Sequence, residues 1–254
     1  MPNLLLSVEN LNVVFGSNQI LRNITFSVER GESVAVIGES GCGKTVLLKT
    51  LINLHPQTSG QVLFDRCDLS QLSYFDLARI RTRFGFVFQQ AALFDSMTIE
   101  ENAAFPLLQH TKKTKSEIAE TVKRLLHETG LDDETLLKKP AELSGGMRKR
   151  VGIARALALE PELMLYDEPT TGLDPVMSDV INDLMISVRE RYGVTSIMVT
   201  HDLRSACKVA RRIIMLSSLT KLNADEPQII FDGTPEEFVR SQNKRVKQFT
   251  SVSV

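Results

Sequence analysis

Four short apolar runs, each followed at once by a glycine or a polar residue, constrain the fold of this chain most strongly. The runs are residues 33–37, 84–88, 163–166 and 195–199. Gly38, Gln89 and Asp167 follow the first three directly, and His201 follows the fourth after Thr200. Such runs are typical of parallel strands that are buried on both faces. Because open α/β sheets bind ligands beyond the carboxyl ends of their strands, we expect the four residues to converge on one site.

The first run leads into a glycine-rich loop and then into an apolar helix. The sequence GESGCGKT at residues 38–45 is the GxxxxGK[ST] phosphate loop in the strand-loop-helix context that it requires. Its backbone amides would cradle phosphates, Lys44 would reach the β and γ oxygens, and the Thr45 hydroxyl would bind Mg²⁺. The predicted nucleotide-binding residues here are Gly38, Glu39, Ser40, Gly41, Cys42, Gly43, Lys44, Thr45 and Val46.

A second candidate anion site lies at Ser144, Gly145 and Gly146, where a helix is expected to begin. Ser144 is a suitable N-cap, and the two glycines would let a phosphate approach exposed amides at the positive end of the helix dipole. The helix carries apolar residues at spacings of three and four, which predicts one buried face. Its cations, which are Arg148, Lys149, Arg150 and Arg155, are expected mostly on a solvated face.

Asp167 and Glu168 are adjacent carboxylates at the end of a buried run. Two such groups are costly there unless they meet a metal or a reactant, and we favour that interpretation over a salt-bridged structural pair. Taken alone, His201 and Gln89 are more often structural residues. Their shared position at strand ends favours a place in the site, whereas the other three histidines receive no role.

The length and composition of the chain limit the class of protein to which it can belong. The chain has 254 residues, 43% of them hydrophobic, and a net charge of −1, which fits one globular domain with or without a subdomain and gives no support to a nucleic-acid binder. Three cysteines without CxxC spacing indicate neither a disulfide framework nor a zinc site. No run approaches the roughly 20 apolar residues that span a bilayer, so a cytoplasmic protein is expected, with any membrane role supplied by a partner.

The remaining segments predict the organisation around the strands. Residues 4–31 are expected to form short antiparallel strands, and Phe15 could either stack on an adenine or belong to the core. A helical subdomain is expected over 92–160, whose apolar stretches at 91–97 and 105–108 are either core, the favoured interpretation, or a groove for a partner helix. The long 217–227 connection receives no role, and the tail from Ser241 is expected to be frayed or bound to a partner.

Taken together, these motifs resemble the nucleotide-binding subunit of an ABC transporter over nearly the whole chain. The matching segments are the phosphate loop 38–45, the Q-loop Gln89, the signature LSGG at 143–146, the strand 163–167 with Glu168, the D-loop 172–174 and the H-loop His201. Within the family the chain is most similar to the Mla/Mce-type phospholipid-transport ATPases, on GKTVLL at 43–48, ALFDSMT at 92–98, ENAAFPL at 101–107 and LSGGMRKRV at 143–151. It departs from the family at Met147, where glutamine is usual, and at Phe15, where tyrosine is frequent.

The resemblance implies a P-loop NTPase fold of class α/β, with a mainly parallel core sheet, an N-terminal antiparallel β subdomain and an inserted helical subdomain. The core would comprise residues 1–91 and 161–240, the helical subdomain 92–160 and the tail 241–254. ATP and Mg²⁺ would be the cofactors, with Asp167, Thr45 and Gln89 as metal ligands.

The same resemblance implies how the site would work. Glu168 would polarise the attacking water, His201 would contact the γ-phosphate and Gln89 would link the metal and water to the membrane partner. Two copies would meet head to tail, so that each ATP lies between the phosphate loop of one copy and the signature of the other, and Asp174 would communicate across the dimer.

The expected partners are a second copy, an integral membrane permease, an Mce-domain lipid-binding protein and a small accessory subunit, at the cytoplasmic face of the inner membrane. One alternative is an ABC ATPase for another cargo, as in amino acid import, lipoprotein release or cell division. The other, less favoured, is a role in DNA repair or at the ribosome. A single nucleotide-binding unit without a coiled-coil insertion or a basic excess argues against the latter.

Overall fold

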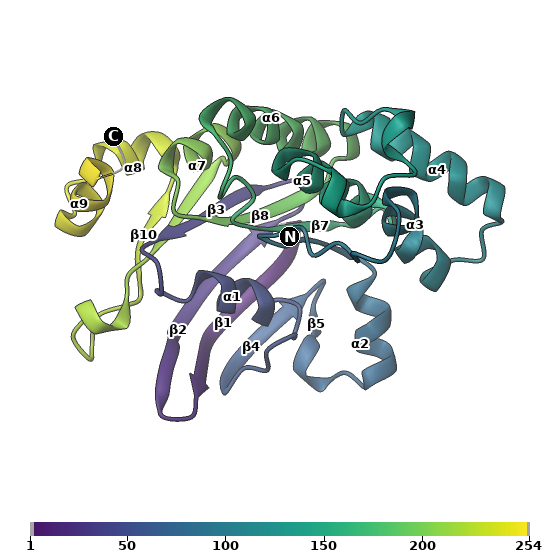
Figure 1. The fold of residues 1–254 in the computed structure, drawn as a ribbon. Coiled ribbons are helices and arrows are strands. Elements are labelled where there is room, and N and C mark those ends of the chain that lie inside the picture. The colour runs from purple at the N-terminus through teal and green to yellow at the C-terminus, as the bar shows by residue number, and fades with distance from the viewer. Residues whose placement is uncertain (1–2, 253–254) are drawn as a thin grey trace. The chain divides into compact units, whose positions relative to one another are not determined.

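The computed structural model describes residues 3–252, which form two compact units (Figure 1). The first unit comprises the residues up to Arg81 together with those from Thr195 onward, and the second comprises Thr82–Val194. This division places the strands that precede Gln89 and Glu168 with the helical segment. The boundaries at 92 and 160 therefore do not coincide with the two units, and the subdomain assignment stays a prediction.

An antiparallel sheet opens the first unit, with the strand order β2-β1-β4-β5. Its strands are β1 (Leu4–Phe15), β2 (Asn18–Glu29), β4 (Ser59–Phe64) and β5 (Cys67–Asp68). The N-terminal segment thus forms two long strands instead of the several short ones that are predicted. Asn10 and Asn23 adopt left-handed backbone conformations, with φ of 47° and 48°, and the pairing shifts register near them. These asparagines interrupt the alternation of side chains without ending the strands.

Parallel strands form the other sheet of the first unit. Here β3 (Ser33–Gly38) lies between β8 (Thr195–Thr200) and β9 (Arg212–Leu216), parallel to both. A further strand, β10 (Ile229–Gly233), pairs antiparallel with β9. Every residue of β3 and β8 is buried, which explains why the apolar residues of these two strands form continuous runs, 34–37 and 197–199, instead of alternating with exposed polar residues.

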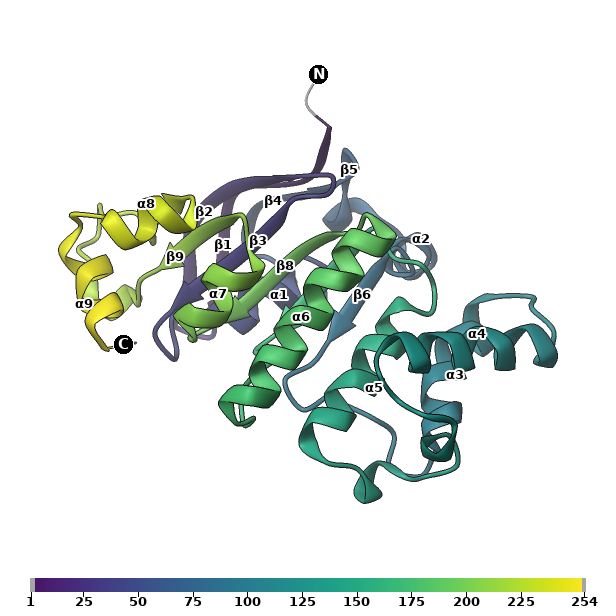
Figure 2. The ribbon, with the colours of Figure 1, turned by 90° about the horizontal axis from the view of Figure 1, so that it is seen from above.

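Five helices of the described chain belong to the first unit. They are α1 (Lys44–Thr50), α2 (Tyr74–Arg81), α7 (Leu203–Val209), α8 (Pro235–Arg240) and α9 (Lys244–Val252). The prediction of a frayed tail is wrong over α9, because this segment is helical, Val246 is buried and Arg245 forms an ion pair with Glu226 at 2.9 Å. Figure 2 shows α8 and α9 together at the yellow end of the chain.

The second unit combines a pair of parallel strands with helices. The strands are β6 (Phe84–Val87) and β7 (Leu163–Asp167), and the helices are α3 (Ile99–His110), α4 (Lys115–Glu128), α5 (Gly145–Leu157) and α6 (Pro175–Tyr192). Capping boxes at Thr98 and Thr114 begin α3 and α4. On α4, the residues at helical spacing, Ile118, Val122, Leu125 and Leu126, are all buried, as the spacing predicts. Within residues 3–252, no helix is long and apolar enough to cross a bilayer.

Candidate functional site

The phosphate loop of the first unit connects β3 to α1. Gly43, just before α1, has a φ of 101°, and a Cβ there would lie 2.8 Å from the Leu21 side chain. At Gly38 a Cβ would lie 2.4 Å from the carbonyl oxygen of Leu216. Both positions therefore require glycine, for backbone conformation or for space. The loop thus follows the path that the sequence motif predicts, from a buried strand into a helix N-terminus.

Lys44 is buried, and its ammonium lies across its own loop. The Nζ atom donates to the carbonyl oxygen of Gly38 at 2.8 Å and to that of Glu39 at 3.2 Å. These bonds hold a cation against the segment whose amides would cradle a polyanion. The loop carries three glycines, a lysine and a hydroxyl at Thr45, so its residues fit a nucleoside triphosphate with Mg²⁺.

His201 follows the strand next to the one that ends in the phosphate loop. Ile37 of β3 pairs with Thr200 of β8 in parallel register, so Gly38 and His201 leave the sheet at the same edge. Asp202 caps α7 by accepting from the amides of Arg204 at 3.0 Å and Ser205 at 3.2 Å. This cap fixes the turn in which His201 lies, with the imidazole exposed.

Phe15 lies at the end of β1 and is 43% exposed. Its ring contacts the His55 ring edge-on, with the centroids 5.4 Å apart. The sequence leaves open whether this ring is a core residue or an adenine-stacking residue. Its exposure in the structure shows that it is not a core residue.

The second unit brings Gln89 and the two carboxylates to one edge of its strand pair. Val87 pairs with Tyr166 in parallel register, so Gln89 and Asp167 lie at equivalent ends of β6 and β7. Asp167 and Glu168 are both buried, and Glu168 has a left-handed φ of 47°. The Thr171 hydroxyl donates to Glu168 Oε2 at 3.0 Å. A left-handed residue other than glycine is a strained position of the kind found at functional sites.

The signature segment begins α5 as predicted. Ser144 caps the helix by accepting from the amide of Met147 at 3.2 Å. A Cβ on Gly146 would lie 2.5 Å from the terminal carbon of Met177, so glycine lets this turn approach α6 closely. Asp174 caps α6 by accepting from the Met177 amide at 3.0 Å. The Asp174 carboxylate therefore already has a structural task within the subunit.

The prediction of a solvated face for the cations of α5 is wrong. Lys149 is only 5% exposed, and its ammonium donates to the carbonyl oxygens of Gln89 and Glu168, the latter at 3.2 Å. Arg148 donates to the Leu143 carbonyl at 2.6 Å and Arg150 to that of Gly130 at 2.9 Å. The spacing of charges alone does not reveal that loops of the same unit cover this face of the helix.

Arg155 and Gly152 hold the residues that follow Gln89. Ala91 and Ala92 have left-handed φ values of 59° and 45°, and Arg155 donates to their carbonyl oxygens at 2.6 and 2.8 Å. A Cβ on Gly152 would lie 3.3 Å from the Ala91 Cβ, which is a tight contact. The Q-loop, here residues 89–95, thus lies against a row of residues on α5. The row consists of Lys149, Gly152 and Arg155, which are spaced by three. We call residues 149, 152 and 155 the Q-loop clamp.

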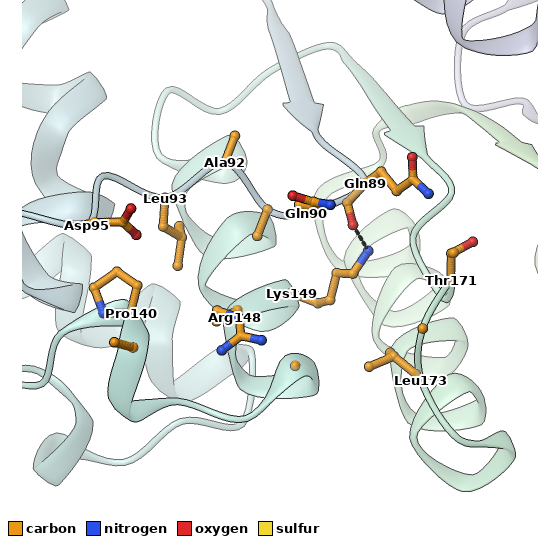
Figure 3. Close-up of a pocket in the computed structure, with 14 residues that line it drawn as sticks. Gln89, Gln90, Ala92, Leu93, Asp95, Pro140, Arg148, Lys149, Thr171 and Leu173 are labelled. Carbon is orange, nitrogen blue, oxygen red and sulfur yellow. Dashed lines mark hydrogen bonds between the residues drawn. The ribbon is translucent and has the colours of Figure 1, made fainter.

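A cavity of about 690 Å³ opens beside this clamp (Figure 3). The Q-loop lines it on one side, and the start of α5, the D-loop and residues 140–141 line the rest. Figure 3 shows Lys149 reaching Gln89 while Arg148 and Thr171 lie around the same space. The sequence assigns no function to Lys149, Arg155 or Thr171. One sequence pattern could have indicated the clamp: Gly152 lies three residues from a cation on either side, Lys149 and Arg155, within a predicted helix.

A second hollow of about 290 Å³ is lined by aromatic rings on β6, the Q-loop and α3. Phe94, which is 42% exposed, and Phe105 have ring centroids 4.8 Å apart, and the Arg155 guanidinium lies 5.9 Å from the Phe94 centroid. Pro106 also lines this hollow, and Leu108, on the same stretch of α3, is 55% exposed. The favoured prediction of core is therefore wrong for Phe94 and Leu108, whereas Ala91 and Leu107 of the same stretches are buried, as that prediction requires. Phe94, Phe105 and Pro106 line a groove, and its use by a partner helix stays a prediction.

Residues 21–171 match the family described as ABC transporter. The chain is 39% identical over 244 residues to the probable ribonucleotide transport ATP-binding protein mkl of Mycobacterium leprae, covering 96% of this chain and 68% of that protein. It is 37% identical over 245 residues to the intermembrane phospholipid transport system ATP-binding protein MlaF of Haemophilus influenzae, covering 96% and 89%. It is also 37% identical over 238 residues to the L-cystine import ATP-binding protein TcyC of Bacillus subtilis, covering 92% and 95%.

Solved structures show the same fold. The dimeric ATP-binding cassette MJ0796, in a post-hydrolysis state with ADP and phosphate, matches with a TM-score of 0.81 and 30% identity over 91% of this chain and 98% of that one. CbiO1 from Clostridium perfringens, part of the ABC transporter complex cbiONQ, matches with a TM-score of 0.82 and 28% identity over 99% and 96%. The chain therefore belongs to the ABC transporter family, with the ABC ATPase fold predicted from its motifs, and is an ATPase subunit that hydrolyses ATP.

Proposed function

We propose that this ATPase subunit energises the movement of phospholipid between bacterial membranes, from the cytoplasmic face of the inner membrane. The observation that carries the proposal is the similarity to MlaF, whose name describes intermembrane phospholipid transport and which aligns along most of both chains. The segments ALFDSMT at 92–98 and ENAAFPL at 101–107 add to it, because they form the loop and helix beside the apolar groove.

Within the site, we assign the triphosphate to residues 38–46 and to the signature residues Ser144, Gly145 and Gly146 of a second copy. Phe15 stacks on the adenine, and Asp174 acts across the dimer. Amide-rich surfaces on both sides of the triphosphate would supply positioning and electrostatic stabilisation, which is most of what phosphoryl transfer needs. Bound Mg²⁺ would neutralise charge on the phosphates.

Glu168 is the group that we assign to the attacking water, with His201 at the γ-phosphate. The buried Glu168 carboxylate accepts a hydrogen bond from Thr171, which fixes its orientation before water arrives. Its backbone carbonyl and that of Gln89 both accept from Lys149, so the two loops share one anchor. Asp167, Thr45 and Gln89 offer the oxygen ligands that Mg²⁺ prefers.

The aromatic groove of the second unit is the surface that we assign to the permease. Its lining includes Phe94, Phe105 and Pro106, and an exposed aromatic groove suits an amphipathic helix of a membrane partner. Arg155 links this groove to the Q-loop, because its guanidinium lies near the Phe94 ring and donates to Ala91 and Ala92. An Mce-domain lipid-binding protein and a small accessory subunit would complete the transporter.

A different cargo is the second candidate, and the similarity to TcyC and to mkl, whose names describe cystine import and ribonucleotide transport, favours it. The deciding experiment isolates the tagged Glu168→Gln variant with ATP from its native membranes and identifies the proteins and lipids that accompany it. A multi-span permease, an Mce-domain protein and enriched phospholipid are expected. A permease without lipid would overturn the cargo, and recovery with ribosomes or DNA would overturn the transport role.

A further inference from the structure

The connection between β9 and β10 reaches the phosphate loop of its own unit. Residues 217–227 form a loop with a short helical turn at 219–221, seen in yellow-green beyond β10 in Figure 1. At its end Gln228 is 1% exposed, although its side chain is polar. A buried amide of this kind must find partners for both its oxygen and its nitrogen.

Gln228 joins the phosphate loop to β2 by three hydrogen bonds. Its Nε2 donates to the carbonyl oxygen of Cys42 at 3.0 Å and to that of Ile20 at 3.1 Å. Its Oε1 accepts from the amide of Arg22 at 2.8 Å. Both the oxygen and the nitrogen of the side-chain amide are therefore hydrogen-bonded. The bonds to Ile20 and Arg22 fix the amide against β2, and the third bond holds the carbonyl of Cys42 in the phosphate loop.

The Cys42 carbonyl belongs to the same peptide group as the Gly43 amide. In a planar trans peptide the C=O and N–H bonds point in opposite directions, so a donor that holds the carbonyl also fixes the direction of the N–H. Gly43 has a φ of 101°, a backbone conformation that only glycine adopts readily. A hydrogen bond to the carbonyl also polarises the peptide and strengthens the amide as a donor.

Side chains from three other elements hold the connection in place. Arg22 of β2 donates to the carbonyl oxygens of Asn223 and Glu226, both at 2.8 Å. Arg245 of α9 donates to the Lys221 carbonyl at 2.8 Å, and Lys221 forms an ion pair with Glu39 of the phosphate loop at 2.6 Å. Because that ion pair is largely exposed, we expect it to contribute little. The buried Gln228 is the main link.

We propose that Gln228 is a positioning residue for triphosphate binding, which holds the Cys42–Gly43 peptide from behind so that the Gly43 amide faces the phosphates. The connection 217–227, through Gln228 at its end, thereby becomes part of the nucleotide site, although it is far from the motif in sequence. This inference rests on the assignment of the phosphate loop to ATP in the proposed function.

The test is Gln228→Glu in the full chain. Glutamate keeps the size of the side chain and the acceptor for Arg22 but replaces the donor with a carboxylate oxygen that faces two carbonyls. We expect the dissociation constant for MgATP, measured by calorimetry, to rise about tenfold or more. The matched control is Gln242→Glu on an exposed residue near α9, whose dissociation constant should stay within about twofold of wild type.

A second readout separates positioning from stability. The melting temperature without nucleotide reports the fold alone, whereas the increase in melting temperature caused by MgATP reports binding. We expect MgATP to raise the melting temperature of Gln228→Glu by less than it raises that of the wild-type protein. An unchanged dissociation constant together with a lower melting temperature without nucleotide would overturn the inference and leave a purely structural role. If the variant does not fold, Gln228→Asn, whose shorter amide cannot reach Cys42, replaces it with the same expected and opposing outcomes.

Nucleotide binding by the wild-type protein and by Lys44→Ala separates a failure of the phosphate loop assignment from a failure of the Gln228 inference. If it binds MgATP and Lys44→Ala does not, the phosphate loop assignment stands and only the Gln228 result decides the inference. If the wild-type protein binds no nucleotide, or if Lys44→Ala binds as tightly as wild type, the phosphate loop assignment fails, and the inference fails with it.

Discussion

Lys149 shows how one buried side chain can join two functional loops. Burial lowers the pKa of Lys149 to about 8, although the nearby carboxylates of Asp167 and Glu168 act to raise it. A buried ammonium is costly, and here the cost is offset by hydrogen bonds to the backbone of Gln89 and Glu168. The Q-loop and the loop that carries Glu168 therefore share a single anchor.

Replacing Lys149 by Met should separate catalysis from binding. The variant keeps the length and the apolar stem but removes both bonds, so the loops lose their common anchor while the phosphate loop is untouched. We expect kcat to fall about tenfold or more and the dissociation constant for MgATP to change by less than about threefold. Steady-state kinetics and calorimetry measure the two quantities. Lys115→Met, on the exposed start of α4, is the control, and a wild-type kcat in Lys149→Met would refute the anchor role.

Glu168→Gln tests the assignment of the general base. The amide keeps the shape and the bond from Thr171 but cannot accept the proton of the attacking water. Turnover should fall by about 10²–10⁴-fold while ATP binding persists. Glu120→Gln, an exposed position on α4, should hydrolyse ATP at the wild-type rate. Turnover at that same rate in Glu168→Gln would exclude this carboxylate as the base.

Residue types at strand ends could be predicted from sequence, whereas their supports could not. Gly38, Gln89, Asp167 and His201 each end a buried run, and a short pattern carries that information. Lys149 and Gln228 are supports whose partners are backbone carbonyls distant along the chain. Because every residue has a backbone carbonyl, the sequence does not show which carbonyl accepts a side-chain hydrogen bond. Only the structure shows these bonds.

At the scale of elements, an ionic link joins the end of α4 to the end of α6. Glu128 accepts from Arg124 and from Arg191, both at 3.2 Å, and from the Tyr192 hydroxyl. Burial raises the pKa of Glu128, but the hydrogen bonds from Tyr192 and Arg124 outweigh it, so the pKa lies below its usual value. The folded state thus prefers the ionised carboxylate more than the unfolded chain does.

That preference gives a stability prediction with a defined pH dependence. A carboxyl whose pKa is lowered by folding stabilises the protein above its unfolded pKa and loses this contribution as the pH falls from about 4.5 through the folded pKa. Glu128→Gln should therefore lower the free energy of unfolding by about 1 kcal/mol at pH 7 and by less below pH 4. Urea unfolding at several pH values measures it, with Glu120→Gln as control. A deficit that stays constant with pH would contradict the ionic origin.

Elements with a buried face could be predicted, and elements without one could not. The buried strands β3, β7 and β8 and the amphipathic helix α4 follow from their apolar patterns. The helix α2 does not, because Tyr74 and Phe75 are 79% and 82% exposed and only Leu77 is buried. Its aromatic residues therefore do not mark a buried side.

At the scale of the whole molecule, a head-to-tail dimer should leave an isolated subunit with half of each site. ATP turnover per subunit should then rise with protein concentration, which a dilution series measures; fast turnover that is strictly proportional to concentration in a verified monomer would exclude the dimer.

A mixture of two inactive variants tests whether the phosphate loop of one copy and the signature of the other form one site. Lys44→Ala disables the phosphate loop and Ser144→Arg disables the signature, so each protein alone should be inactive. A mixed dimer contains one intact composite site, and the mixture should regain turnover. If the mixture stays as inactive as its components, the two motifs do not act across a dimer.

The order of the strands along the chain also has a consequence for biosynthesis. Both neighbours of β3, which are β8 and β9, are encoded after residue 194, and Gln228 comes later still. While the ribosome is still translating the middle of the message, β3 has been made but has neither neighbour, and its apolar residues have no sheet to enter. Nascent chains that stall before β9 should therefore need chaperone protection and should not be retained on immobilised ATP. The nucleotide motif that is made early becomes competent only near the end of synthesis.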